Sequence, residues 1–344
     1  MAIFSRDLGI DLGTTNVVVY AEGKGIVLRE PAVVAVDKNS GKVLKIGSAA
    51  RNMLGRTPGN VVAMRPIREG VISDYEMTEK MLAEFFKKIF KVSFVKPRCI
   101  ISVPSGVTSI EERAVVQIAL EAGARRVYLT EEPLAAALGA NLNFDGPDGH
   151  MVVDIGGGTT DVGVLTMNGL ANSSSVKVAG DAFDDAIIRF LRKKHGLVVG
   201  QTAAEEIKIN IGCVYERPEQ LRMQAKGRDY KTGLSKTVEI TSDDVLEALR
   251  RPARQITDEV LSALEQTTPE LVADIARNGI TLTGGGSLIW GMDKLVSERT
   301  GMTCTVADDA DSCVAYGCGK SLGWINHMQE GPINIARRRL LKER

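Results

Sequence analysis

The chain has 344 residues, of which 44% are hydrophobic and 25% charged, and its 43 Lys and Arg balance its 43 Asp and Glu. This length suits two lobes rather than one core, and zero net charge provides no basic field for nucleic acid, so we expect no nucleic-acid partner. No run of about 18 apolar residues is present, and the first strand begins too early for a signal peptide, so we expect a cytoplasmic protein without a membrane span.

Five Cys and three His are scattered along the chain, and no Cys-x-x-Cys pair occurs. This spacing argues against a disulfide framework and against a structural zinc site. We therefore expect the cysteines to be buried, reduced thiols.

An internal repeat organises the chain. The sequence LGIDLGTTNVVVY begins at Leu8, and MVVDIGGGTTDVGVL begins at Met151, nearly half the chain later. The repeat aligns Asp11 with Asp154, and the second copy has two additional glycine positions. Each copy has an apolar β-rich run, a glycine turn and a second β-rich run, which predicts a hairpin at the front of each lobe. Two related lobes would face each other across a cleft that holds a ligand.

The rest of the first half alternates helices and strands. The apolar spacing predicts a helix over 78–90, a buried strand over 98–103 and another strand over 127–130. A helix over 108–122 should open with a capping pattern formed by Ser109 and Glu112. A helix over 134–140 should follow, with Pro133 in its first turn.

The second half continues the alternation, which predicts an α/β fold. Helices are expected over 182–195, 203–211, 243–267 and 315–325, and a strand over 279–282. Pro252 should mark a kink or a boundary in the long helix. Residues 31–69 and 181–241 interrupt the two lobes and are predicted to be inserted subdomains, the second becoming β-like over 222–240.

Three loops rich in Gly, Thr and Ser follow strands. In such loops consecutive backbone N–H groups and hydroxyls donate to phosphate oxygens. The chain has neither the GxxxxGK[ST] sequence of a P-loop nor a GxGxxG turn opening a helix, so both common nucleotide folds are disfavoured. The loops are Gly13-Thr14-Thr15, Gly156-Gly157-Gly158-Thr159 and Gly284-Gly285-Gly286-Ser287.

Asp11 and Asp154 occupy equivalent positions, one in each lobe. Two carboxylates beside a triphosphate would repel it unless a cation intervened, and Mg²⁺ is held by one or two carboxylates, waters and phosphates. Alternatively, each Asp only accepts hydrogen bonds from turn N–H groups.

Three further charged residues have two interpretations each. Glu132 follows a strand and precedes Pro133, so it would orient an attacking water or would simply stabilise a helix N-terminus. Glu205 and Lys208 lie on one helix face, where they would grip a ribose or pair with each other in solvent.

The segments IDLGTTN, VVDIGGGTTDV, EEPLAAALGA, LTGGGSLI and DSCVAYGCGK are similar to the phosphate, connector and adenosine motifs of the actin, heat-shock chaperone and sugar kinase superfamily. GKGIVLREPAVVAVDKNSGKVL and GRTPGNVVAMRPIREGVISDYE resemble the bacterial MreB/Mbl family, and that resemblance extends over essentially the whole chain.

The resemblance implies an actin-like ATPase fold with two duplicated ribonuclease-H-like lobes, each with an inserted subdomain, and a nucleotide in the cleft between them. It divides the chain into subdomain IA (1–30, 70–148 and 312–344), IB (31–69), IIA (149–180 and 242–311) and IIB (181–241).

The resemblance also implies roles for single residues. ATP phosphates would be bound by Gly13, Thr14, Thr15 and Asn16 and by Gly156, Gly157 and Gly158. Glu205 and Lys208 would contact the nucleoside, and Gly284, Gly285, Gly286 and Ser287 the adenosine side. Asp11 and Asp154 would hold Mg²⁺, and Glu132 would position the water, with Asp154, Thr159 and Asp161 completing the catalytic set.

Members of this family polymerise with ATP into paired filaments under the inner membrane and direct cell-wall synthesis and rod shape. The resemblance therefore implies an ATPase coupled to polymerisation, with itself and cell-wall elongation membrane proteins as partners. Val92 and Phe94, between lysines, and Phe4, near Arg6, would meet an anionic membrane, or would fold back into the core. A small-molecule kinase on the same fold is the alternative function.

Overall fold

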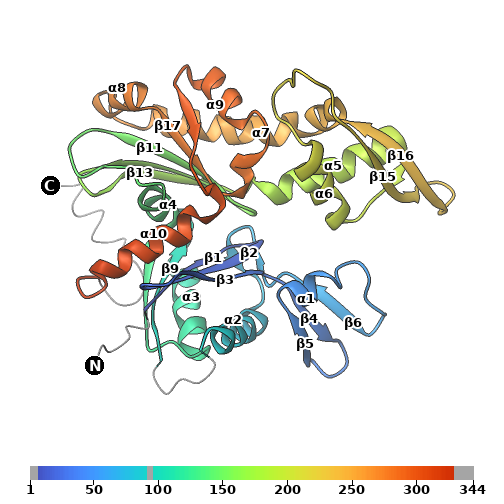
Figure 1. Ribbon diagram of the computed structural model, residues 1–344, viewed down its shortest axis with the longest axis horizontal. Coiled ribbons are helices and arrows are strands. Elements are labelled where there is room, and N and C mark those ends of the chain that lie inside the picture. Colours follow the sequence, from blue (N-terminus) through green and yellow to red (C-terminus); the bar gives the residue numbers. More distant parts are fainter. Residues whose placement is uncertain (1–6, 91–95, 329–344) are drawn as a thin grey trace. The chain divides into compact units, whose positions relative to one another are not determined.

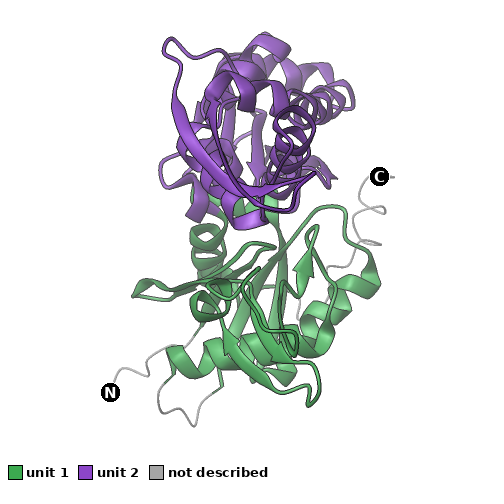
Figure 2. Cartoon of the chain, turned by 90° about the vertical axis from the view of Figure 1, so that its right-hand side faces the viewer, with its two compact units in different colours: residues 1–139, 314–344 green, residues 140–313 purple. Residues whose placement is uncertain are grey.

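The computed structural model describes residues 7–90 and 96–328. It divides the chain into two compact units, coloured separately in Figure 2: unit 1 holds residues 1–139 and 314–344, and unit 2 holds residues 140–313. Unit 1 is therefore built from both ends of the sequence. The finer division into four subdomains stays a prediction.

Unit 1 is built on a five-stranded sheet in the order β10-β9-β1-β2-β3 (Figure 1). β1 and β2 form the first predicted hairpin, and β2 continues antiparallel into β3. β9 runs parallel to both β1 and β10. Parallel neighbours need crossover connections, which α2 and α3 provide. The strands are Leu8–Leu12 (β1), Asn16–Ala21 (β2), Gly25–Pro31 (β3), Arg98–Val103 (β9) and Arg126–Glu131 (β10).

The helices of unit 1 bury one apolar stripe each. In α2 the residues Met81, Leu82 and Phe85 are fully buried in the same core as the strands β1 and β9. The last helix, α10, packs closely against α4 through small residues. A Cβ added to Gly317 of α10 would overlap the backbone of Ala135 in α4. These helices are Tyr75–Ile89 (α2), Ser109–Glu121 (α3), Glu132–Gly139 (α4) and Cys313–Ser321 (α10), with a short helix Leu322–Trp324 (η3) after them.

A small sheet in the order β5-β4-β6 falls in the first predicted insertion. It carries a short helix, and a two-stranded ribbon follows it. The elements are Val34–Asp37 (β4), Val43–Ile46 (β5), Ser48–Arg51 (α1), Val61–Met64 (β6), Ile67–Arg68 (β7) and Val71–Ile72 (β8).

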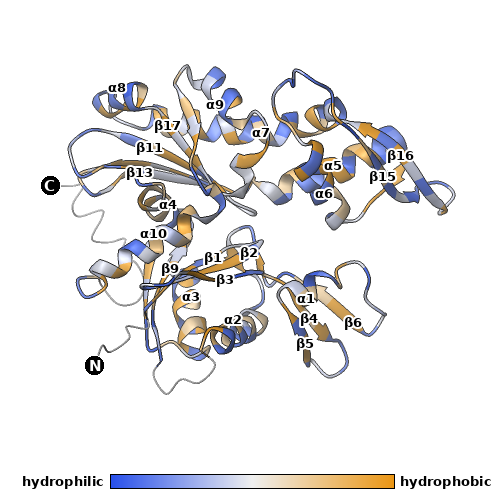
Figure 3. Ribbon diagram, in the orientation of Figure 1, coloured by the Kyte–Doolittle hydropathy of each residue, from blue (hydrophilic) through white to orange (hydrophobic). Residues whose placement is uncertain are grey.

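Unit 2 repeats the sheet of unit 1, which confirms the predicted duplication. Its strands lie in the order β13-β12-β11-β17-β18, with an antiparallel triplet joined to parallel strands as in unit 1. Figure 3 shows apolar colour concentrated in the strands of both sheets. The strands are His150–Ile155 (β11), Thr160–Thr166 (β12), Gly169–Val176 (β13), Ile280–Thr283 (β17) and Cys304–Val306 (β18).

Residues 181–241, the second predicted insertion, are mainly helical at first and then β, as predicted. This segment contains α5, α6 and the small sheet β14-β15-β16. The remaining elements of unit 2 are Gly180–His195 (α5), Leu197–Val198 (β14), Gln201–Ile211 (α6), Arg222–Asp229 (β15), Ser235–Thr241 (β16), Ser242–Glu265 (α7), Pro269–Asn278 (α8), Gly285–Leu288 (η1), Met292–Thr300 (α9) and Ala310–Ser312 (η2).

One local prediction is wrong, and another is narrowed. The capping box of α3 is formed by Thr108 and Glu111, one residue before the predicted pair. The pattern Ser/Thr-x-x-Glu occurs twice in succession here, and Glu112 is instead a buried side chain. Of the two alternatives predicted at Pro252, the boundary is excluded, because α7 continues through it from Ser242 to Glu265, and the kink stays a prediction.

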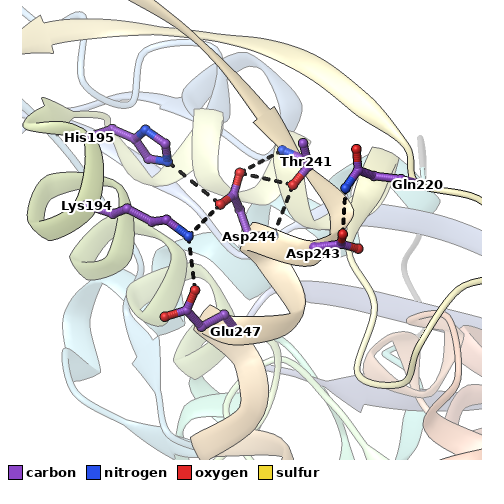
Figure 4. Close-up of polar contacts among 7 residues, drawn as sticks. All are labelled: Lys194, His195, Gln220, Thr241, Asp243, Asp244 and Glu247. Carbon is purple, nitrogen blue, oxygen red and sulfur yellow. Dashed lines mark hydrogen bonds and ion pairs between the residues drawn. The ribbon is translucent and has the colours of Figure 1, made fainter.

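The end of α5 is joined to the start of α7 by a charged cluster (Figure 4). Lys194 lies 2.9 Å from Asp244 and 3.0 Å from Glu247, and Asp244 also accepts hydrogen bonds from the backbone N–H and hydroxyl of Thr241. Partial burial disfavours the charged form of Asp244, but the hydrogen bonds from Lys194 and Thr241 outweigh it and lower the pKa of this carboxyl.

All five cysteines are buried and free, as predicted. Burial raises the pKa of the Cys99 and Cys318 thiols, and raises that of Cys304 to about 12. Within residues 7–90 and 96–328, no helix has the length and apolar character needed to cross a membrane.

Candidate functional site

The turn of the second hairpin presents a row of backbone donors. The N–H of Gly156 donates to the carbonyl of Thr159 at 2.9 Å and closes the turn. Among the described residues, no acceptor meets the N–H groups of Gly157, Gly158 and Thr159. Successive free N–H groups form an anion-binding concavity, so this turn suits a phosphate.

Helix α5 begins directly behind this turn. The N–H of Gly180 donates to the carbonyl of Gly156 at 3.2 Å, and the N–H of Asp181 donates to the carbonyl of Gly157 at 2.8 Å. The turn's carbonyls are therefore bound to the helix, and the positive end of the helix dipole lies at the turn.

The Gly284 loop lies against the same turn. β17 runs parallel to β11 with Thr283 beside Asp154, so both loops leave the same edge of the sheet. Gly284 has φ +80°, and a Cβ added there would lie 2.3 Å from the carbonyl oxygen of Ile155. Only glycine fits this close approach. The structure thus brings two of the three predicted loops together in unit 2.

Two carboxylates lie beside these loops. Asp154 is directly opposite Asp161 in the antiparallel pair, so both side chains are on one face of the sheet. Both are buried, and the Thr283 hydroxyl donates to Asp154 at 2.6 Å. Burial, reinforced by the charge of Asp161, raises the pKa of Asp154 to about 7 despite the Thr283 hydrogen bond.

Lys208 points toward the phosphate turn, and the ion pair that it makes is not with Glu205. Its ammonium lies 2.8 Å from the Asp184 carboxylate on α5 and donates to the carbonyl of Gly180 at 3.0 Å. The structure therefore contradicts the interpretation in which Lys208 pairs with Glu205 in solvent. Burial raises the pKa of Asp184 to about 6, although Lys208 acts in the opposite direction.

The turn of the first hairpin resembles the second in its free donors. Among the described residues, no acceptor meets the N–H groups of Gly13, Thr14 and Thr15. The Thr14 hydroxyl accepts a hydrogen bond from the N–H of Gly70 at 3.0 Å, which ties the turn to the segment between β7 and β8. Asn16 begins β2 directly after this turn.

The predicted acids of unit 1 lie at the carboxyl edge of its sheet. Asp11 is near the end of β1, and Glu132, which is buried, directly follows β10. The thiol of Cys318 has its pKa raised mainly by burial and further by Asp11 and Glu132, so both carboxylates act on one buried atom. Ligands bind at this edge of parallel strands in α/β sheets.

Each unit thus holds its own part of the predicted site. Unit 1 carries Asp11, the Gly13–Asn16 turn and Glu132, whereas the other candidates belong to unit 2. Among the residues described, no group of three or more His, Cys, Asp or Glu could hold a metal ion by itself. Val92, Phe94 and Phe4 lie outside the described residues.

Sequence reasoning missed Asp184 and Thr283. Both are buried polar residues in contact with predicted site residues. Neither belongs to a glycine loop with a recognisable spacing, so no local signal distinguished them from ordinary core-facing residues.

The MreB/Mbl protein family model matches residues 5–330 of the chain. The chain belongs to the MreB/Mbl family. It is 47% identical over 321 residues to the cell shape-determining protein Mbl of Bacillus subtilis, covering 93% of this chain and 96% of the relative. It is 46% identical over 330 residues to the cell shape-determining protein MreB of Escherichia coli, covering 94% and 95%. These values do not separate MreB from Mbl.

Solved structures confirm the actin-like fold. MreB5 of Spiroplasma citri bound to ADP superposes with a TM-score of 0.88 at 37% identity, covering 92% of this chain and 96% of that one. The same protein bound to AMPPNP gives a TM-score of 0.87. The MamK double helical filament, at 21% identity and a TM-score of 0.79, shares the fold.

Proposed function

We propose that this chain is a filament-forming ATPase of the MreB/Mbl family that acts in cell-shape determination. The observation that carries the proposal is the pair of glycine turns, each with three consecutive N–H groups that meet no acceptor in the described structure. The ADP-bound and AMPPNP-bound relatives and the cell-shape names of the curated relatives support it.

The turns would bind the phosphates of ATP. The Gly157, Gly158 and Thr159 N–H groups would donate to phosphate oxygens from unit 2, and those of Gly13, Thr14 and Thr15 from unit 1. Glu205 and the Gly284–Ser287 loop would contact the nucleoside. The hydrogen bonds from α5 to Gly156 and Gly157 hold the unit 2 turn in place before ligand arrives.

The buried acids suit a divalent cation. Asp154 and Asp161 lie opposite each other and are both buried, an arrangement that bound positive charge would stabilise. Mg²⁺ would be held by Asp154, with Asp11 from unit 1, and would neutralise phosphate charge when bound. Glu132 would position the attacking water, and Thr159 and Asp161 would complete the catalytic set.

Hydrolysis would be coupled to polymerisation into paired filaments at the inner face of the cytoplasmic membrane. There the filaments would direct cell-wall synthesis through elongation membrane proteins.

Membrane contact is proposed through Val92 and Phe94, with Phe4 near Arg6. In vesicle sedimentation, replacing Val92 and Phe94 with Ser should release the protein from anionic vesicles. Unchanged sedimentation would remove this segment from the membrane contact.

The decisive experiment is sedimentation and electron microscopy of the purified chain with ATP and Mg²⁺. Filaments and phosphate release are expected, and both should be lost in EDTA. Persistent monomer with and without anionic vesicles would contradict a cytoskeletal function. Phosphate transfer to a sugar or acid in a metabolite screen would instead favour a small-molecule kinase.

A further inference from the structure

Lys208 reaches from its own helix to the start of another. It lies on α6, but its ammonium contacts two groups of α5: the carbonyl of Gly180 at 3.0 Å and the carboxylate of Asp184 at 2.8 Å. An ammonium has three donors, so one remains for a ligand. The Lys208 side chain is 17% exposed and that of Asp184 is 1% exposed, so solvent and ligands can reach the ion pair only from the lysine side.

The first residues of α5 form the back of the phosphate turn. Gly180 and Asp181 donate to the carbonyls of Gly156 and Gly157. A Cβ built on Gly180 would lie 3.4 Å from both the Gly156 oxygen and the Lys208 nitrogen. The ammonium of Lys208 is therefore a neighbour of the turn itself and is not confined to the nucleoside side.

A buried carboxylate determines where this ammonium stays. Lysine has a long flexible side chain that loses conformational freedom when it is held in one place. The near-complete burial of Asp184 keeps its acceptor fixed, and a lysine that lost this partner could turn toward solvent.

We infer that Asp184 is a positioning residue for nucleotide binding. It holds the Lys208 ammonium at the Gly156–Gly158 turn, where the third donor meets a phosphate, and it links α6, which carries Glu205, to that turn. This inference rests on the proposed function. Simple electrostatics and this inference predict opposite effects of removing the Asp184 charge. Electrostatics alone predicts tighter ATP binding, because a negative charge near a phosphate site is lost, whereas loss of positioning predicts weaker binding.

The test is a double-mutant cycle on ATP affinity, measured by calorimetry with Mg²⁺. Asp184→Asn and Lys208→Met should each weaken binding roughly 10-fold, which is about 1.4 kcal/mol. The combined variant should lose no more than Lys208→Met alone, because Asp184 acts through Lys208. Asp185→Asn, an exposed neighbour on the same helix, is the matched control and should bind like the unaltered chain.

Lys208→Met leaves a buried carboxylate without its partner and can unfold unit 2, but the combined variant replaces the ion pair with two neutral groups of similar size. Thermal unfolding of each variant separates stability from affinity, since a purely structural role would lower the midpoint without this non-additive pattern. Unchanged or tighter ATP binding by Asp184→Asn, or additive losses, would overturn the inference alone. Absence of ATP binding by the unaltered chain would overturn the proposed function and this inference with it.

Discussion

Asp154 lies directly opposite Asp161 in the second hairpin, whereas Asp11, its counterpart in the first hairpin, lies opposite Val18. Both hairpins close around a four-residue turn and have the same strand register, so the additional glycines of the second copy do not lengthen the turn, and Asp161 occupies the position that Val18 occupies in the first hairpin. Two buried carboxylates on one sheet face repel each other. The second hairpin therefore has a pair of facing acids where the first hairpin pairs an acid with a valine.

The buried Asp154 should make the metal-free protein less stable as pH rises. Its pKa in the folded chain, about 7, exceeds the ordinary value of 3.8, so folding favours the protonated form. Stability should fall between about pH 4 and pH 7 by an amount on the order of 1 kcal/mol or more. Asp154→Asn should remove this part of the pH dependence, which thermal unfolding in EDTA at pH 5.5 and 7.5 would measure. An equal pH dependence in both proteins would contradict the raised pKa.

Neighbouring glycines of the third loop should respond differently to alanine. Gly284→Ala places a Cβ at positive φ and against the Ile155 carbonyl, so it should lower the free energy of unfolding by about 3 kcal/mol. A Cβ on Gly285 meets its nearest atom, on Asp311, at 4.0 Å, so Gly285→Ala should fold normally.

Because Gly285 is proposed to face the nucleotide, Gly285→Ala should weaken ATP binding without loss of stability. Urea unfolding and nucleotide calorimetry on both variants distinguish these outcomes. Full ATP affinity in Gly285→Ala would place this residue outside the site.

Glu132→Ala should retain ATP binding but slow hydrolysis roughly 10²-fold, because a buried carboxylate that orients water acts on the chemical step. Phosphate release under single-turnover conditions measures the chemical step directly. Turnover equal to that of the unaltered chain would leave Glu132 as a helix-terminal acid only.

The charged cluster between α5 and α7 should contribute stability through Asp244 and little through Glu247. Asp244→Ala removes the acceptor of the Thr241 cap and the more buried partner of Lys194, so it should cost about 1–2 kcal/mol. Glu247→Ala removes an exposed partner and should cost less than about 0.5 kcal/mol.

The Asp244 contribution should also depend on pH. Its pKa is lowered in the folded state, so its stabilisation is present above the ordinary value of 3.8 and is lost as pH falls through the lower folded value. The difference in unfolding midpoint between Asp244→Ala and the unaltered chain should therefore shrink on acidification from pH 7 to pH 3. A constant difference would mean that the charge of Asp244 contributes nothing.

Local sequence patterns were sufficient for most elements. The repeat around Asp11 and Asp154 predicted both hairpins, and the helical apolar spacing of Met81, Leu82 and Phe85 predicted α2. Such patterns are readable because strand and helix periodicities are short-range properties of the chain. Where two local patterns competed, as at Thr108 and Ser109, the capping residue was predicted one position too late.

The sequence by itself determined the duplication, the glycine turns and the family, because each depends on residues that are adjacent in the chain. Only the tertiary structure decided that Asp161 faces Asp154, that Thr283 donates to Asp154, and that Lys208 pairs with Asp184. These contacts depend on strand register and helix packing. Both are fixed by burial of the whole core and not by the spacing of neighbouring residues.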